Sequence, residues 1–178
     1  MPQNILAETE LKQIAATPYQ IISPASNAPI IGIFQDSMLG SYRFTRPNIT
    51  FTPKEAMNLL MMIKDIDTKD LFENKKKITS FEILSQIMKP ITLKNKTKLF
   101  EDHEDPETSN NIMEIKNGKY MRGQLEKSML GSSTKGIIHR IFNDYGHMHA
   151  AQFIDDLQNV ITEYMTTSSY SVGISDLI

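Results

Sequence analysis

Residues 111–125 read NIMEIKNGKYMRGQL and contain the clearest structural signal in the chain. The pair Asn117-Gly118 lies between two runs that contain isoleucine, methionine and tyrosine. An Asn-Gly pair in this setting predicts a β-hairpin, because a type I′ turn requires a positive φ at both central residues. We therefore expect two antiparallel strands over about residues 112–125.

Helices are predicted on the N-terminal side of this hairpin. Thr52 and Thr79 are each followed three residues later by a glutamate, Glu55 and Glu82, and each set forms the pattern of a capping box. The first helix should extend to about residue 63 and the second to about residue 88, before Pro90. Two short extended segments, 20–23 and 29–34, are expected further upstream because two runs with β-branched residues flank a turn-rich loop there.

The C-terminal third is also predicted to be helical. One helix is expected over 134–145, with Gly146 as a left-handed terminator. A second is expected over 148–166, where the apolar residues fall on one helical face. The predicted strands and helices do not alternate along the chain, so the fold class is predicted to be α+β. It should contain small mixed or antiparallel strands with a hairpin, flanked by helices.

Composition limits the functional classes. The chain has 178 residues, which suits a single domain, and its formal net charge is −2. A protein that binds nucleic acid unaided is usually strongly basic, so this balance argues against such a role. The absence of cysteine excludes disulfides, thiolate zinc sites and cysteine nucleophiles. Without a signal peptide or a membrane-length apolar run, an intracellular location is expected.

Residues 94–111 are very polar and are predicted to be a surface insertion. Within them, residues 101–107 read EDHEDPE and could bind a hard cation, as in a small metal-dependent hydrolase. However, calcium loops space their oxygen ligands around a central glycine, and that pattern is missing here. A solvated loop is the favoured interpretation.

Residues 131–136, GSSTKG, precede a predicted helix. Small residues and free N–H groups at a helix N-terminus suit an anion, and Lys135 would add positive charge. The order and spacing do not match a P-loop, so an ordinary helix start is the competing interpretation.

Read in order, several segments resemble the pore domain, or domain 3, of the largest subunit of multisubunit DNA-directed RNA polymerases, in its eukaryote-like form. The most specific ones contain Gln35-Asp36, within GIFQDSMLG at 32–40, and residues 131–139, at the end of GQLEKSMLGSSTKGIIH at 123–139. Further matches occur at 1–11, at Ile22-Ser23-Pro24, at Thr45-Arg46 and in SVGISDLI at 171–178, whereas residues 47–111 match only in their helices.

The resemblance implies a floor for the active centre and a wall for the pore, or secondary channel. Nucleoside triphosphates enter there, and the RNA 3′ end is extruded there during backtracking. Candidate contacts to RNA or nucleotide are Lys127, Ser132, Ser133 and Lys135. Candidate structural residues at the active-centre floor are Pro2, Gln3, Gln35 and Asp36.

The resemblance also implies what this chain lacks. The aspartates that bind the catalytic Mg²⁺ precede the Pro2-Gln3 segment in the family, so no catalytic or metal-binding residue and no cofactor is expected within the chain. We expect a slice of a larger subunit that is inactive alone. Its partners would be the rest of that subunit, other polymerase subunits, the RNA 3′ end and nucleoside triphosphates, with DNA contacted only through the whole complex. No membrane role is expected, and the compartment would be the nucleus, the cytoplasm or a virion.

An autonomous protein-interaction module with the same fold is an alternative. A slice of a subunit should expose apolar side chains near its two ends, notably Ile5, Leu6, Val172, Ile174 and Ile178. If these side chains are packed instead, an autonomous domain is favoured.

Overall fold

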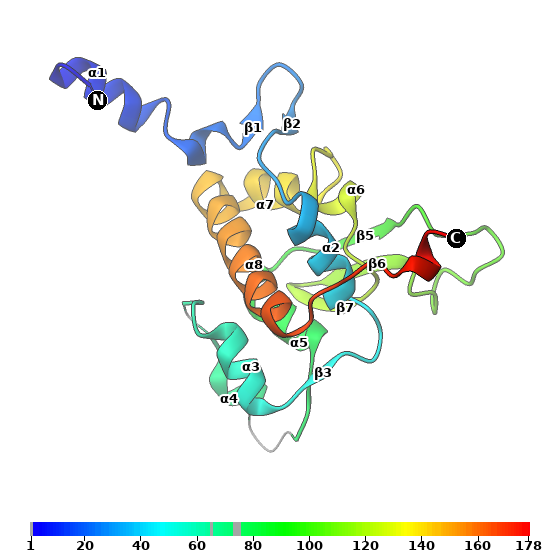
Figure 1. Cartoon of the computed structure of the whole chain (residues 1–178). Coiled ribbons are helices and arrows are strands. Elements are labelled where there is room, and N and C mark those ends of the chain that lie inside the picture. The colour runs from blue at the N-terminus through cyan, green and yellow to red at the C-terminus, as the bar shows by residue number, and fades with distance from the viewer. Residues whose placement is uncertain (1, 65, 73–75) are drawn as a thin grey trace.

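The computed structural model describes residues 2–64, 66–72 and 76–178. Helix α8 (His147–Thr167) runs through the middle of the fold (Figure 1). Helices α2 (Gln35–Phe44), α3 (Pro53–Leu60), α5 (Ser80–Ile87) and α7 (Ile137–Tyr145) all pack against it. The side chains that α8 buries are, as the periodicity predicted, largely those of one apolar face: Phe153, Leu157, Val160, Ile161 and Tyr164.

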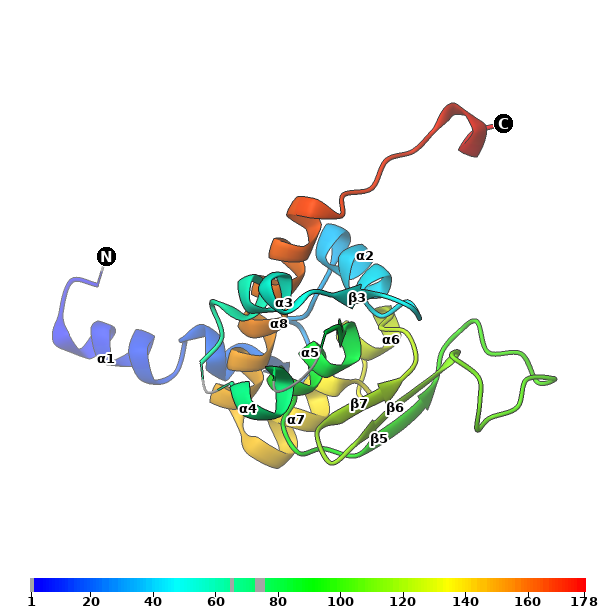
Figure 2. The ribbon, with the colours of Figure 1, turned by 90° about the horizontal axis from the view of Figure 1, so that it is seen from below.

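A three-stranded antiparallel sheet lies on the other side of α5 (Figure 2). Its strands are β5 (Leu93–Lys96), β6 (Ile112–Lys116) and β7 (Lys119–Arg122), in that order. The hairpin between β6 and β7 is confirmed, with positive φ angles of 46° at Asn117 and 79° at Gly118.

Two smaller antiparallel pairs complete the strand content, and the α+β class is confirmed. β1 (Ile22–Ser23) pairs with β2 (Ala28–Pro29). β3 (Thr50–Phe51) pairs with β4 (Ile78–Thr79), and each of these strands leads directly into a helix.

Both predicted capping boxes are present. The Thr52 hydroxyl accepts from the Glu55 N–H at 3.4 Å, and the Glu55 carboxylate accepts from the Thr52 N–H at 2.7 Å. The equivalent distances at Thr79 and Glu82 are 3.3 and 2.8 Å. These reciprocal bonds satisfy N–H groups that the first helical turn leaves without a partner.

Several predicted boundaries were wrong. Residues 94–96, expected in the polar insertion, belong to β5, because pairing with the buried strand β6 outweighs their polar composition. The segment 30–34 is not a strand, since only Pro29 of the predicted stretch pairs in β2.

The predicted ends of several helices also differ from the structure. α3 ends at Leu60 and α7 begins only at Ile137. Gly146 has φ 89° and ψ 174°, so it is not a left-handed helical terminator but leads directly into α8.

Short helical elements occur where the sequence indicated none. They are the 3₁₀ turns η1 (Thr17–Gln20) and η2 (Ile174–Asp176) and the short helices α4 (Thr68–Phe72) and α6 (Lys127–Leu130).

Three segments project from the body in different directions (Figure 2). They are helix α1 (Ile5–Gln13), the loop between β5 and β6, and the C-terminal tail from residue 168. The apolar residues near the two ends are exposed, as expected. Each of them is at least 67% exposed: Ile5, Leu6, Val172, Ile174 and Ile178. Within the described ranges, no helix is both long and apolar enough to cross a bilayer.

Candidate functional site

The two most distinctive sequence segments, 32–40 and 123–139, lie side by side in the structure. The Ile33 N–H donates to the carbonyl oxygen of Leu130 at 3.1 Å. Gly32 permits this approach, because a Cβ atom there would lie 2.7 Å from the same oxygen. The structure therefore joins segments that are about 100 residues apart in the sequence at a backbone-to-backbone contact.

Helix α2 is held in place by three further contacts. Gly40 packs against Ile161 of α8. The Arg43 guanidinium donates to the carbonyl oxygens of Ser168 and Ser169, at 3.2 and 2.8 Å, and so binds the C-terminal end of α8, where carbonyl groups lack helical partners. The Thr45 hydroxyl accepts from the Leu125 N–H at 3.0 Å.

The four candidate contact residues lie on α6 and on the loop that joins it to α7. Lys127, Ser132 and Lys135 are exposed, whereas Ser133 is half-buried. The Ser133 hydroxyl accepts from the Lys135 N–H at 3.2 Å, and the Lys135 carbonyl accepts from the side-chain amide of Asn95 at 2.8 Å. The loop is therefore tied internally and to β5, while the lysine and Ser132 side chains face solvent.

The start of α7 follows this loop directly. Its N-cap is Gly136, and no side chain among the described residues caps its first turn. A Cβ atom on Gly136 would lie 2.6 Å from the Met129 carbonyl oxygen, so close packing against α6 requires glycine there. The free N–H groups of such a turn are chemically suited to an anion.

Gln35 and Asp36, two of the candidate structural residues, begin α2. Among the described residues, no side chain caps the first turn of α2, and Gln35 has a positive φ of 51°. The Asp36 carboxylate instead accepts a hydrogen bond from the Tyr170 hydroxyl in the C-terminal tail. This bond raises the pKa of Tyr170, because it stabilises the protonated phenol.

Pro2 and Gln3 are not brought together with the other candidates. They are exposed and precede α1, which extends away from the body (Figure 1). Asn4 caps α1 by accepting from the Ala7 N–H at 2.7 Å. Helix α1 buries none of its residues.

The acidic loop 101–107 does not form a metal site. The Glu104 carboxylate accepts from the Ser109 hydroxyl and from the Asn111 amide, at 2.8 Å for the latter, and these bonds lower its pKa. The Asp105 carboxylate accepts from the Glu107 N–H at 3.0 Å. Across the described residues, no group of three or more histidine, aspartate or glutamate side chains is arranged to hold a metal ion. The Glu104 and Asp105 carboxylates therefore serve the loop's own hydrogen bonds, and the described residues lack the converging carboxylates that a metal-dependent hydrolase would need.

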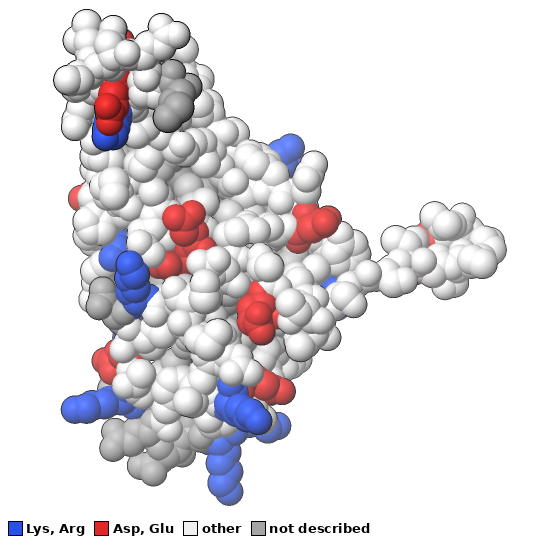
Figure 3. Space-filling model, turned by 60° about the vertical axis from the view of Figure 1, so that its left-hand side comes forward, with Lys and Arg blue, Asp and Glu red and all other residues white. Residues whose placement is uncertain are grey.

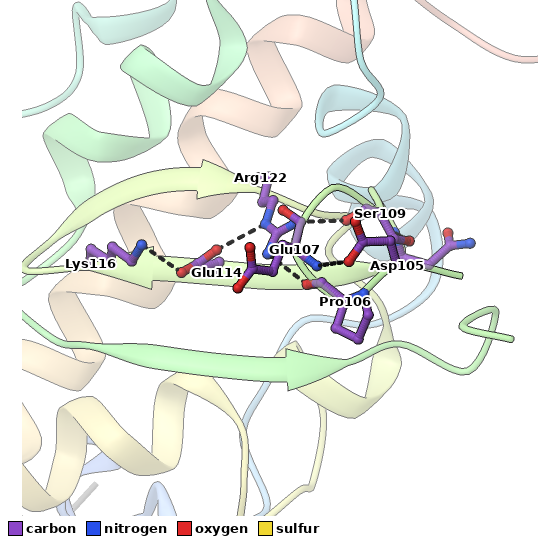
Figure 4. Close-up of polar contacts among 8 residues, drawn as sticks. Asp105, Pro106, Glu107, Ser109, Glu114, Lys116 and Arg122 are labelled. Atoms are coloured by element: carbon purple, nitrogen blue, oxygen red, sulfur yellow. Dashed lines mark hydrogen bonds and ion pairs between the residues drawn. The ribbon is translucent and has the colours of Figure 1, made fainter. Parts of the chain in front are cut away.

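Arg122 fastens this loop to the sheet (Figure 4). Its Nε donates to the Glu114 carboxylate at 2.9 Å, and its Nη atoms donate to the carbonyl oxygens of Pro106, at 2.9 Å, and Glu107. Glu114 is nearly buried and also pairs with Lys116 at 2.9 Å. Hydrogen bonds from Lys116 and then Arg122 lower the pKa of Glu114.

Charged side chains of both signs are dispersed over the face of the molecule that Figure 3 shows. Figure 3 shows one face on which acidic and basic side chains are scattered, with lysine and arginine gathered toward the lower end. Outside the residues drawn in grey, the basic side chains on this face form no continuous track. The mixture of both signs on this face accords with the formal net charge of −2.

Sequence reasoning missed the residues that hold the site together. Thr45 was noted only as part of a Thr-Arg pair, and Asn95, Arg43 and Tyr170 carried no signal at all. Each acts on a partner at least 40 residues away, so no local pattern could reveal its role.

Comparison with known proteins shows which family contains these two segments. The family model described as "RNA polymerase Rpb1, domain 3" matches residues 20–177. The chain belongs to this family. The match to Rpb1 domain 3 includes both packed segments, at 32–40 and 123–139, and most of the tail, whereas Pro2 and Gln3 precede it.

Related largest subunits match the Rpb1 domain 3 chain over its whole length. It is 29% identical to DNA-directed RNA polymerase II subunits RPB1-A and RPB1-B of Trypanosoma brucei brucei. It is 32% identical to DNA-directed RNA polymerase subunit 1 of Acanthamoeba polyphaga mimivirus. The aligned regions make up 10% of the trypanosome proteins and 11% of the viral one, so the chain spans about a tenth of these relatives. The resemblance to the polymerase largest subunit is confirmed.

Proposed function

We propose that this domain forms part of the floor of the active centre and of the wall of the pore, or secondary channel, in a DNA-directed RNA polymerase. In this role it guides nucleoside triphosphates inward and accommodates the RNA 3′ end when the enzyme backtracks. Family membership supports the polymerase context. The structural observation that carries the proposal is the loop between α6 and α7, which is held firmly while Lys127, Ser132 and Lys135 remain exposed.

A channel wall has particular physical requirements. It must attract phosphate groups without trapping a chain that slides past. Lys127 at the start of α6, with Lys135 and the two serines on the anchored loop that follows, gives a modest positive charge together with neutral hydrogen-bonding groups. Lys127 is the principal candidate for contact with RNA or nucleotide, and Ser132, Ser133 and Lys135 complete the surface.

Other residues of the domain would support its structure near the active centre and would not contact RNA or nucleotide. Gln35 and Asp36 would hold the start of α2 near the active centre, and the Asp36–Tyr170 hydrogen bond gives Asp36 a physical means to position the tail. Pro2 and Gln3 would help to position the segment with the Mg²⁺-binding aspartates, which precedes them in the polymerase family. As the family resemblance implies, Mg²⁺ would be bound by residues outside this chain.

The exposed ends support a domain embedded in a larger assembly. Helix α1 has nine residues and buries none of them, although isolated helices shorter than about 12 residues are marginal in water. Contacts with the rest of the largest subunit and with other polymerase subunits would cover its apolar residues and those of the tail. DNA would be reached only through the whole complex, inside the nucleus, the cytoplasm or a virion.

Photo-crosslinking from the assembled polymerase tests the channel role. A benzophenone amino acid is placed at position 135, and at position 54 as a control, because Lys54 is also an exposed lysine but lies on α3. We expect the reagent at 135 to label the RNA 3′ segment in backtracked complexes and not in forward complexes. Labelling that is equal at both positions, or absent from 135, would refute the proposal.

Lysine variants provide an independent measurement. In the same polymerase, Lys127→Ala should raise the KM for nucleoside triphosphates or slow cleavage of backtracked RNA several-fold, because a charge-assisted phosphate contact is lost. Lys54→Ala is the matched control and should leave both rates unchanged. If the two variants behave alike, Lys127 is not a contact residue.

A further inference from the structure

A groove runs between α3 and α8 on a surface that the channel role does not use. Two hollows of about 130 and 280 Å³ lie next to each other and share Asn58, Leu59 and Glu163 as lining residues. Figures 1 and 2 both show α3 beside α8. The two hollows therefore form one continuous groove along the contact between these helices.

The groove has an exposed apolar edge. Met61 and Met62 line it and are 77% and 66% exposed, and Met57, one helical turn before Met61, is 55% exposed. Leu59 is buried and Phe51 half-buried, so they form a firm apolar floor. Methionine is flexible and polarisable, and it is used at surfaces that adapt to a bound peptide. Three exposed methionines together are more than the scattered apolar residues of an ordinary surface.

The charge along the groove has one sign. Of the described residues that line it, the charged ones are Glu55 and Glu163. Glu55 uses one carboxylate oxygen in the capping box of α3, and that bonding lowers its pKa and keeps it ionised. Glu163 lies on α8 and is exposed. A bound segment therefore meets an apolar floor and a negative rim.

This charge selects among the possible occupants. The chain's own exposed apolar segments are poor matches, because α1 carries Glu8 and Glu10 against one Lys12, and the tail from residue 168 carries Asp176 as its one charge. A second copy that docked through either of these segments would thus bring acidic groups to an acidic rim. Nucleic acid is disfavoured for the same reason. The complementary occupant is a peptide segment with apolar side chains flanked by lysine or arginine.

We propose that the groove between α3 and α8 is a docking site for a basic, apolar segment of another protein chain. The apolar side chains of that segment would displace water from Leu59, Met61 and Met62, and its basic side chains would pair with Glu55 and Glu163. This role is independent of the channel surface, because it uses no residue of the loop between α6 and α7.

Crosslinking in the native assembly identifies the occupant. A benzophenone amino acid at position 62 should crosslink to a peptide of another chain that contains apolar residues and at least one lysine or arginine. The matched control is position 121, because Met121 is also half-exposed but lies on β7. Absence of a crosslink at 62, a crosslink to a second copy of this chain, or capture of an acidic segment would each overturn the proposal.

The captured segment is then made as a synthetic peptide and its affinity for the complete chain is measured. Glu163→Lys should weaken binding about tenfold and reduce its dependence on salt, because a screened ion pair has been removed. Met62→Ala should also weaken binding, whereas Met121→Ala should not. All three sites are exposed, so the variants are expected to fold, which circular dichroism would verify. Equal affinities for the wild type and Glu163→Lys would contradict the role of the acidic rim.

Discussion

Gly40 of α2 lies so close to Ile161 of α8 that a Cβ atom on the glycine would be 2.5 Å from the Cγ2 atom of the isoleucine. Ile161 is buried and β-branched, so it cannot turn aside. Met165 is the next neighbour, at 3.0 Å from the same position. This contact sets the separation of the two helices and hence the position of the segment that begins α2.

Gly40→Ala should lower the free energy of unfolding by about 1–2 kcal/mol, because overpacking against Ile161 outweighs the gain of about 1 kcal/mol in helix propensity. Urea denaturation would measure the change. Gly173→Ala is the matched control, since the nearest atom to a Cβ there is 3.4 Å away. In the double variant Gly40→Ala/Ile161→Ala the two losses should be less than additive. Strict additivity would show that the two residues are not coupled.

Thr45→Val should destabilise the chain by about 1–3 kcal/mol, because the buried Leu125 N–H loses its acceptor while the side chain keeps its shape. Thr45→Ser retains the hydroxyl and should lose much less. Thermal or urea unfolding of the three proteins would test this order. Similar stabilities for the valine and serine variants would mean that the hydrogen bond does not contribute.

Asp156 should make stability depend on pH. It is buried on α8, and this burial raises its pKa. The hydrogen bond from the Gln152 amide, at 2.6 Å, and the charges of Lys89 and Lys64 oppose the shift, whereas Asp155 adds to it. A group whose pKa is higher in the folded state favours folding while it is protonated. Its stabilising contribution is complete below the ordinary aspartate pKa of about 4 and is lost as pH rises through the raised value.

Asp156→Asn keeps an acceptor for Gln152 and does not titrate. The free energy of unfolding of the wild type should therefore fall relative to this variant as pH rises from about 4 toward neutrality. Urea unfolding of both proteins at a series of pH values gives the difference between their free energies of unfolding. The other titrating groups are common to both proteins, so their contributions cancel in this difference. A difference that stays constant with pH would show that the pKa of Asp156 is the same in the folded and unfolded states.

Arg122→Gln should release the loop that follows β5. Amides of residues 104–109 should exchange hydrogen faster, because their carbonyl anchors at Pro106 and Glu107 lose the guanidinium. Hydrogen-exchange mass spectrometry would measure this directly. Arg140→Gln is the control, since Arg140 forms an exposed ion pair with Asp144 within α7. Equal exchange of the loop in both variants would show that Arg122 does not hold it.

Local signals predicted the elements whose cause is local. The Asn117-Gly118 turn and the two Thr–Glu capping boxes each depend on residues within four positions of one another, and all three are present. The pattern of the 32–40 and 123–139 segments also indicated the family. The candidate contact residues Lys127, Ser132, Ser133 and Lys135 could be chosen in this way, and their roles remain predictions.

The interactions that assemble these elements could not be predicted in the same way. Strand β5 forms from a polar segment because β6 offers it a partner, and Asp36 bonds to Tyr170 rather than to its own backbone. The chain's local pattern sufficed for the hairpin turn and the two capped helix starts, since those depend on the backbone geometry of a few adjacent residues. The pairing of β5, the Gly40–Ile161 contact and the groove beside α3 arose only from packing, because each depends on groups that folding brings together from distant parts of the chain.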